Sequence, residues 1–85
     1  MKLKSKFASA VLKSRKELGY TQREVAEAVS VTVHWYQKVE TGTKLPGSLT
    51  LLRLILFLRL DVEDFREEVG LVVPVSAVQR KHALR

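Results

Sequence analysis

The residues with the most chemistry to offer lie on the outward side of a predicted short helix over 32–39. They are Val33, His34, Gln37 and Lys38, where a solvated helix usually carries Glu and Lys. An apolar side chain, two hydrogen-bonding side chains and a cation form a mixture suited to contact with another molecule. A second short helix precedes this one across a tight turn, and the pair has the shape of a helix-turn-helix that reads DNA.

Catalytic chemistry has little support in the composition. The chain has 85 residues and no cysteine, and its two histidines, His34 and His82, have no metal-ligand spacing. It has no glycine-rich phosphate loop, its acidic residues are scattered, and a chain of this length has little room for a pocket. We therefore expect no catalytic residue, no metal, no cofactor and no enzymatic activity.

Helix start signals place the two short helices at about 21–28 and 32–39. Thr21 can accept a hydrogen bond from the backbone N–H of Glu24, whose side chain can reach back to Thr21, and this is a capping box. Thr32 is a good N-cap for the second helix. The inward positions recur at helical spacing, and we expect them to be buried: Val25, Ala26, Val29, Tyr36 and Val39.

A longer string of spaced residues links this pair of helices to a known family. The string consists of residues 19–29, Val31 with Thr32, residues 39–42, and Pro46. On these positions the chain resembles the phage repressor and Cro helix-turn-helix family, also called the xenobiotic-response-element type, over residues 12–65. That family usually has Gly where Ser30 stands, so a left-handed conformation at Ser30 would cost on the order of 1 kcal/mol.

The resemblance implies an all-α fold, a compact five-helix bundle of the lambda-repressor-like DNA-binding type. The DNA-binding domain would span 1–68, with the helix-turn-helix at 21–40, and 69–85 would form a C-terminal extension. The resemblance also implies a sequence-specific transcriptional regulator, with repression as the expected effect. It would bind double-stranded DNA at a pseudo-palindromic operator as a homodimer, in the cytoplasm of a bacterium or as a phage protein.

By the same resemblance, two sets of residues would contact DNA. The base-reading set is Thr32, Val33, His34 and Lys38. The phosphate-contacting set is Gln22, Trp35, Gln37, Thr41, Thr43 and Lys44, with backbone N–H groups assisting in the loop over 41–44. The family frequently has Gln or Asn at the outward positions, which read adenine, and this chain has neither at Val33 or His34. We expect Val33 to meet a thymine methyl group and His34 to meet a purine N7 or a phosphate.

A structural ion pair between Arg15 and Glu40 is also implied by the resemblance, tying the first helix to the third. Such a partly buried pair specifies an arrangement more than it adds net stability. Tyr36 stands where the family has Ile, so we expect it in the core with its hydroxyl bonded to a partner.

The first helix is predicted from one cap and one face. Ser5 is its predicted N-cap, and Gly19 ends it as a residue free to take a positive φ. Phe7, Val11 and Leu18 lie near one side of it and should face the core.

The last two helices are likewise predicted from their caps. Ser48 is the predicted N-cap of a fourth helix that runs to about Leu58. Asp61 can cap a short fifth helix, with Val62 and Phe65 packing inward.

The fourth helix has more leucines than one core-facing stripe requires. The stripe predicted for the core is Leu51, Leu52, Ile55 and Leu58. A helix that is apolar nearly all round is buried on more than one side. It is either the central helix of its own domain or the contact with a second copy of the chain. We favour the second copy and place the dimer interface at Leu49, Leu56 and Leu60.

The net charge and the C-terminal extension indicate which kinds of partner the protein could bind. The charge of +6 favours a polyanion, and anionic membrane is the rival to DNA on charge alone. Arg53 and Arg59 interrupt the most apolar stretch, which is too short to cross a membrane.

Residues 71–75 are apolar and should pack against the domain or a protein partner. Two other functions stay open: the antitoxin of a toxin–antitoxin pair, and a protein-interaction module that has lost DNA binding.

Overall fold

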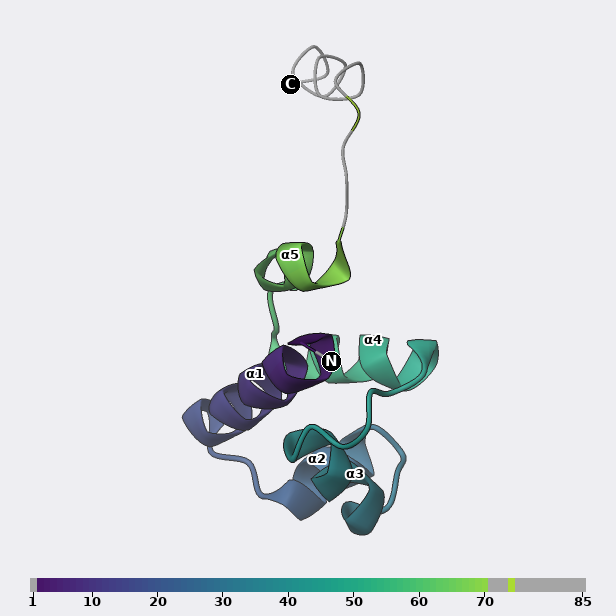
Figure 1. Cartoon of the computed structure of the whole chain (residues 1–85). Coiled ribbons are helices and arrows are strands. Elements are labelled where there is room, and N and C mark those ends of the chain that lie inside the picture. The colour runs from purple at the N-terminus through teal and green to yellow at the C-terminus, as the bar shows by residue number, and fades with distance from the viewer. Residues whose placement is uncertain (1, 71–73, 75–85) are drawn as a thin grey trace.

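The fold is all-α, as the sequence predicts, in a computed structural model that describes residues 2–70 and Pro74 (Figure 1). The elements in chain order are α1 (Lys2–Leu18), α2 (Gln22–Ala28), α3 (Val33–Glu40), α4 (Ser48–Leu58), the short 3₁₀ helix η1 (Val62–Phe65) and α5 (Arg66–Val69). The described residues contain no strand. None of their helices is both long and apolar enough to cross a membrane.

One apolar core holds these elements together. Helix α1 packs on both α3 and α4, and α2 packs on α3 and α4, so that α2 and α3 form a pair on one side of α1 (Figure 1). The buried residues of this core come from every described element except α5: Phe7, Val11, Val25, Ala26, Val29, Tyr36, Val39, Leu54, Leu58 and Phe65. The five inward residues predicted for the helix-turn-helix are all among them, which confirms that part of the prediction.

Helix α1 differs from its prediction at its start and in its last turn. It already includes Lys2, so Ser5 lies inside the helix and is not its cap. The residues around Ser5 are Lys, Leu, Phe and Ala, which offer the helix no break at that point. Leu18 is 38% exposed, although helical phase aligns it with the fully buried Val11. Phase alone does not bury a side chain, because a neighbouring element must also reach it.

Gly19 ends α1 as predicted. Its φ is +79°, and its N–H donates to Lys16 O at 3.2 Å. The next N–H, from Tyr20, donates back to Arg15 O at 3.1 Å. These two bonds satisfy carbonyl groups at the helix end and reverse the chain toward α2.

The turn between α2 and α3 is built on Ser30. Its φ is +62°, the left-handed region that Gly adopts most easily. The N–H groups of Ser30 and Val31 donate to Glu27 O at 3.2 Å and to Ala26 O at 3.0 Å. Backbone hydrogen bonds therefore hold Ser30 in a conformation that its own side chain disfavours.

Replacing Ser30 with Gly should raise the free energy of unfolding by about 0.5–1 kcal/mol, because the left-handed cost disappears. Urea unfolding of Ser30→Gly beside wild type measures this difference. Ser9→Gly is the matched control, since Ser9 is exposed in the middle of α1 and the same change there should destabilise. Equal effects at the two sites would contradict this explanation.

Helix α4 faces the core with Leu51, Ile55 and Leu58 of the predicted stripe, but Leu54 takes the place predicted for Leu52. Gly47 occupies the N-cap and Ser48 is the first helical residue, so the predicted Ser48 cap is wrong. Leu54 and Leu58 are fully buried, whereas Leu52 is 56% exposed. The remaining predicted core residues of this helix, Leu51 and Ile55, are half-buried. Leu60 is also half-buried and packs against the core, unlike Leu49 and Leu56, which are exposed.

The chain after α4 turns through η1 into α5. Asp61 caps η1 as predicted, accepting a hydrogen bond from Glu63 N at 3.0 Å. Phe65 is buried, and its ring centroid lies 5.7 Å from that of Phe7. Val62 is 60% exposed, so its predicted inward position is wrong. Side chains three residues apart eclipse in a 3₁₀ helix, so Val62 lies on the same side as the buried Phe65 without being covered itself.

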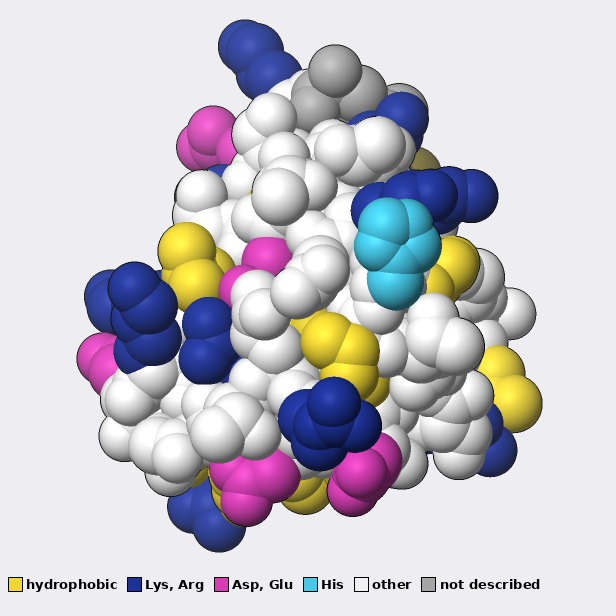
Figure 2. All heavy atoms as spheres, turned by 90° about the horizontal axis from the view of Figure 1, so that it is seen from below, with side chains coloured by type: hydrophobic (Ala, Val, Ile, Leu, Met, Phe, Trp, Pro, Cys, Tyr) yellow, Lys and Arg dark blue, Asp and Glu magenta, His cyan; other side chains and the backbone are white. Residues whose placement is uncertain are grey.

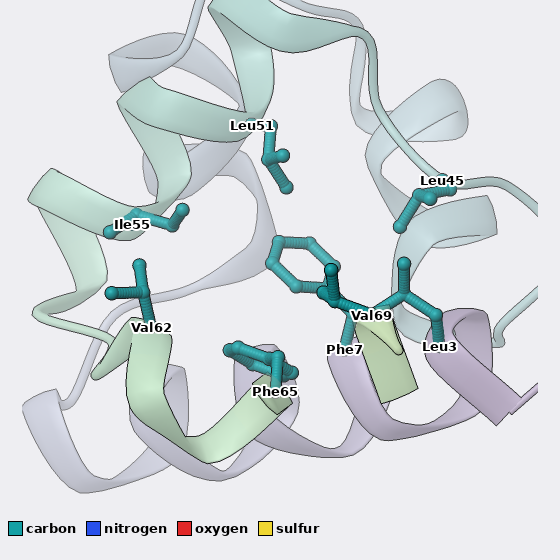
Figure 3. A pocket seen from close by; sticks show the side chains of 8 residues that line it. All are labelled: Leu3, Phe7, Leu45, Leu51, Ile55, Val62, Phe65 and Val69. Carbon is teal, nitrogen blue, oxygen red and sulfur yellow. The ribbon is translucent and has the colours of Figure 1, made fainter. Parts of the chain in front are cut away.

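A small apolar hollow of about 160 Å³ opens at the end of the core, between α1, α4, η1 and α5 (Figure 3). Its lining is entirely aliphatic or aromatic: Leu3, Phe7, Leu45, Leu51, Ile55, Val62, Phe65 and Val69. The predictions made for residues 71–73 and 75–85 lie outside the described residues.

Candidate nucleic-acid interface

The starts of α2 and α3 are fixed by side-chain caps. The Thr21 hydroxyl accepts a hydrogen bond from Glu24 N at 3.1 Å, and the Glu24 carboxylate accepts one from Thr21 N at 2.8 Å. The predicted capping box is therefore present. Thr32 caps α3, with its hydroxyl accepting from Trp35 N at 3.1 Å. Both caps confirm the sequence prediction and set the first turn of α3 in place.

Helix α3 divides into an inward and an outward side. Tyr36 and Val39 are fully buried and anchor it to the core. The predicted DNA-contacting residues on this helix show graded exposure. Thr32, His34 and Gln37 are exposed, while Val33, Trp35 and Lys38 are half-buried, with Val33 and Trp35 packed against the core. Figure 2 shows the molecule from below, the side on which α2 and α3 lie in Figure 1, with a histidine beside Lys and Arg side chains.

The carboxylate of Glu40 is the centre of a hydrogen-bond network beneath this side. Arg15 donates to it through Nε and, at 3.2 Å, through Nη2. The Tyr36 hydroxyl and, at 2.9 Å, Gln22 Nε2 also donate to it. The Arg15 side chain is 14% exposed and that of Glu40 is 5% exposed. Arg15 also donates to Tyr20 O at 3.0 Å, so one guanidinium joins α1, α3 and the loop before α2.

Gln22 connects this network to the outer surface. Its amide nitrogen donates to Glu40, and its amide oxygen accepts from Gln37 Nε2 at 3.0 Å. The side chain of Gln22, in the first turn of α2, is thereby bonded to two residues in the second half of α3. These bonds fix the orientation of α3 relative to α2.

The hydrogen bonds at Glu40 decide its protonation. Burial disfavours the charged carboxylate, but hydrogen bonds from Arg15, Tyr36 and Gln22 outweigh it and hold the pKa of Glu40 below its ordinary value of 4.5. The hydrogen bond with Glu40 raises the pKa of Arg15. Burial, followed by the hydrogen bond to Glu40, raises the pKa of the Tyr36 hydroxyl. At neutral pH the network is therefore a carboxylate, a guanidinium and a neutral phenol.

Acid should remove the stability that Glu40 contributes. Because its folded pKa is depressed, the contribution is present above the ordinary value of 4.5 and is lost as pH falls through the folded pKa. Glu40→Gln is neutral at every pH, so the free energies of unfolding of wild type and variant should converge as the solution is acidified. Urea unfolding from pH 7 downward measures this, and a difference that stays constant would contradict it.

The loop after α3 uses its backbone donors internally. Lys38 O accepts hydrogen bonds from Thr43 N at 2.9 Å and from Lys44 N at 3.1 Å, and Thr41 N donates to Gln37 O at 3.1 Å. Each of these backbone N–H groups already has an acceptor within the chain, so the predicted phosphate contact would fall to the side chains of this loop. The side chains of Thr41, Thr43 and Lys44 remain exposed, and the two hydroxyls lie 3.0 Å apart.

Besides the bonds from Gln22 to Glu40 and from Arg15 to Tyr20 O, two connections in the site were not foreseen in the sequence. The first is the bond from Tyr36 to Glu40, for which the i, i+4 spacing on one helix was an available signal. The second is the bond from Gln37 to Gln22, which joins residues on different helices and has no local signal. The described residues also contain no cluster of His, Cys, Asp or Glu that could hold a metal ion.

Comparison with known families agrees with this geometry. A profile described as the helix-turn-helix domain matches residues 10–69, which is more than half of the chain. No curated protein and no solved structure matches the chain. The matched residues include the whole of α2, α3 and α4 and the Glu40 network. The chain belongs to the helix-turn-helix domain family, in agreement with the repressor-type resemblance of its sequence.

Proposed function

We propose that the protein is a sequence-specific DNA-binding transcriptional regulator, acting as a repressor, that places α3 in the major groove. The observation that carries this proposal is the difference between the inward and outward sides of α3. Its inner side is anchored by Tyr36 and Val39, and its orientation is held by Glu40 and Gln22, while His34 and Gln37 stay exposed on its outer side. A rigid helix with an exposed polar side fits the way such domains enter the groove.

The base-reading role belongs to the first part of α3 and to Lys38. His34 is exposed and suits a purine N7, while Lys38 suits guanine. Val33 is half-buried, so its exposed part would meet a thymine methyl group. Thr32 already accepts a bond from Trp35 N, which leaves its hydroxyl proton to donate.

The phosphate-contacting role belongs to residues around this helix. Lys44 is exposed in the following loop and supplies a cation, with the hydroxyls of Thr41 and Thr43 close by. Trp35 has one indole N–H to donate. Gln22 and Gln37 are bonded to each other, and each side-chain amide keeps one N–H that would donate to the DNA backbone.

Two copies would occupy one operator. A pseudo-palindromic site with half-sites about one helical turn, or about 34 Å, apart would present the same bases to each copy. The bacterial or phage cytoplasm is the setting that this function implies.

Selection of bound sequences from random duplex DNA tests this function. Enrichment of a palindrome that is lost in both Gln22→Ala and Lys38→Ala, and kept in Lys13→Ala on the exposed surface of α1, supports it. No enrichment at low salt would overturn it and would favour a protein-interaction module that has lost DNA binding.

Added salt should weaken DNA binding, and the steepness of this dependence should scale with the number of phosphates that the protein neutralises. Lys44→Ala should reduce the slope of log affinity against log salt by about one, because one cation that displaces counterions is lost. Titrations of the selected duplex at several KCl concentrations measure the slope. Lys13→Ala should leave it unchanged, and an unchanged slope in Lys44→Ala would remove this residue from the interface.

A further inference from the structure

The outer side of α4 carries three exposed leucines in a row. Leu49, Leu52 and Leu56 are 60%, 56% and 78% exposed. Their spacing of three and four residues places them on one side of the helix, opposite the buried Leu54 and Leu58. We call these three exposed side chains the leucine stripe.

Two arginines accompany the leucine stripe. Arg53 is exposed, and at 100° per residue it lies beside Leu49 and Leu56. Arg59 is exposed directly after the last residue of α4. Within the described part of the chain neither arginine forms an ion pair, and α4 itself contains no acidic residue. The surface is therefore an apolar row with a positive border, in which Arg53 has no acidic neighbour on α4 and Arg59 lies near Asp61 and Asp64.

A second copy of the chain does not suit this surface. Two copies packed through the leucine stripe would bring like-charged arginines together, and each copy has a net charge of +6. Leu60, which the sequence predicts in a dimer interface, is packed against its own core. Two copies on one operator need not touch through α4.

A membrane surface also suits it poorly. An interfacial helix inserts a wide apolar face, whereas Leu54 and Leu58 are inside the core and leave only a narrow row outside. A row with alternating spacings of three and four residues is instead the seam along which two helices pack. Charges beside such a seam select the partner helix.

We propose that the leucine stripe is a docking surface for an amphipathic helix of another protein whose apolar seam is bordered by Asp or Glu. The leucines supply the buried contact, and Arg53 and Arg59 pair with the acidic border. This interaction is separate from DNA binding, because none of these residues lies on α2 or α3.

Two synthetic helical peptides of about three heptads test the proposal. Both have leucine at the seam positions, one with Glu beside the seam and the other with Lys, at concentrations where each peptide is monomeric in sedimentation. Fluorescence anisotropy with the full chain should show that the Glu peptide binds at least about tenfold more tightly than the Lys peptide.

Three variants assign the binding to this surface. Leu52→Gln combined with Leu56→Gln should weaken binding of the Glu peptide about tenfold or more. Arg53→Glu combined with Arg59→Glu should reverse the preference between the peptides. Val62→Gln is the matched control, since Val62 is 60% exposed but lies on η1, and it should bind like wild type. Circular dichroism establishes that each variant is folded.

Four outcomes would overturn the proposal. They are equal binding of the two peptides, no binding of either peptide, and binding that the leucine variant retains. The fourth is occupation of the stripe by something else, shown by sedimentation as a dimer that Leu56→Gln abolishes, or by flotation as Leu56-dependent binding to phosphatidylglycerol vesicles.

Discussion

Replacing Glu40 with Ala should lower the free energy of unfolding by about 3 kcal/mol or more. The change removes the acceptor of four hydrogen bonds and leaves the guanidinium of Arg15, whose side chain is 14% exposed, without its carboxylate. It also leaves the Tyr36 hydroxyl, on a residue within the core, without a partner. Urea unfolding at neutral pH measures the loss, which is large for a domain of this size.

Two further variants separate this network from ordinary surface pairs. Tyr36→Phe removes one hydrogen bond to Glu40 and should cost about 1 kcal/mol. Arg66→Ala breaks the exposed pair with Glu63 and should leave stability nearly unchanged. If Glu40→Ala were as mild as Arg66→Ala, the network would have no structural role.

Lys38→Glu should weaken binding to the selected operator by about 100-fold or more. A carboxylate would then stand on the recognition side of α3, where the proposed function places DNA phosphates and guanine, so a favourable contact becomes a repulsive one. Anisotropy titration with labelled duplex measures the change.

Lys13→Glu is the control for the change in net charge. Lys13 lies on the side of α1 that meets Arg59, Asp61 and Asp64, away from α3, and it undergoes the same charge reversal. It should reduce affinity only by the weak, screened effect of a distant charge. A loss equal to that of Lys38→Glu would mean that net charge alone, and not the surface of α3, controls binding.

Local chemistry was enough to predict how the helices of the helix-turn-helix begin and end. The capping box at Thr21, the N-cap at Thr32 and the left-handed Gly19 each depend on residues within a few positions along the chain. A strong local preference leaves few alternatives, so these predictions are confirmed. Ser5 and Ser48 had the right type for a cap but lie inside helices, because a cap also requires the chain to leave helical geometry before it.

The choice of Leu54 over Leu52 for the core-facing side of α4 could not be made in the same way. Apolar residues surround this helix almost completely, so their periodicity does not distinguish Leu54, which is buried, from Leu52, which is exposed. The decision is made by α1 and α2, which pack against it. Tertiary packing of this kind has no signature in a single helix.

In the candidate site, too, features set by local sequence were predicted and features set by tertiary packing were not. The sequence places His34 and Gln37 correctly on the exposed side of α3, because exposure follows from helical phase once Tyr36 and Val39 are buried, whereas Val33 and Lys38 are half-buried. The bond between Gln22 and Gln37 and the internal bonding of the loop at Lys44 depend on how α2, α3 and the loop meet. Those contacts join segments whose relative position in space is set only by the fold.

Mapping the DNA complex residue by residue tests most directly whether α3 is the surface that reads DNA. Backbone amide shifts of isotope-labelled protein would be followed by nuclear magnetic resonance as the selected duplex is added. Binding through α3 predicts the largest shifts at residues 32–38, at Gln22 and at Lys44, with small shifts at Leu52 and Leu56. Large shifts confined to α4 and α5, with α3 unchanged, would contradict it.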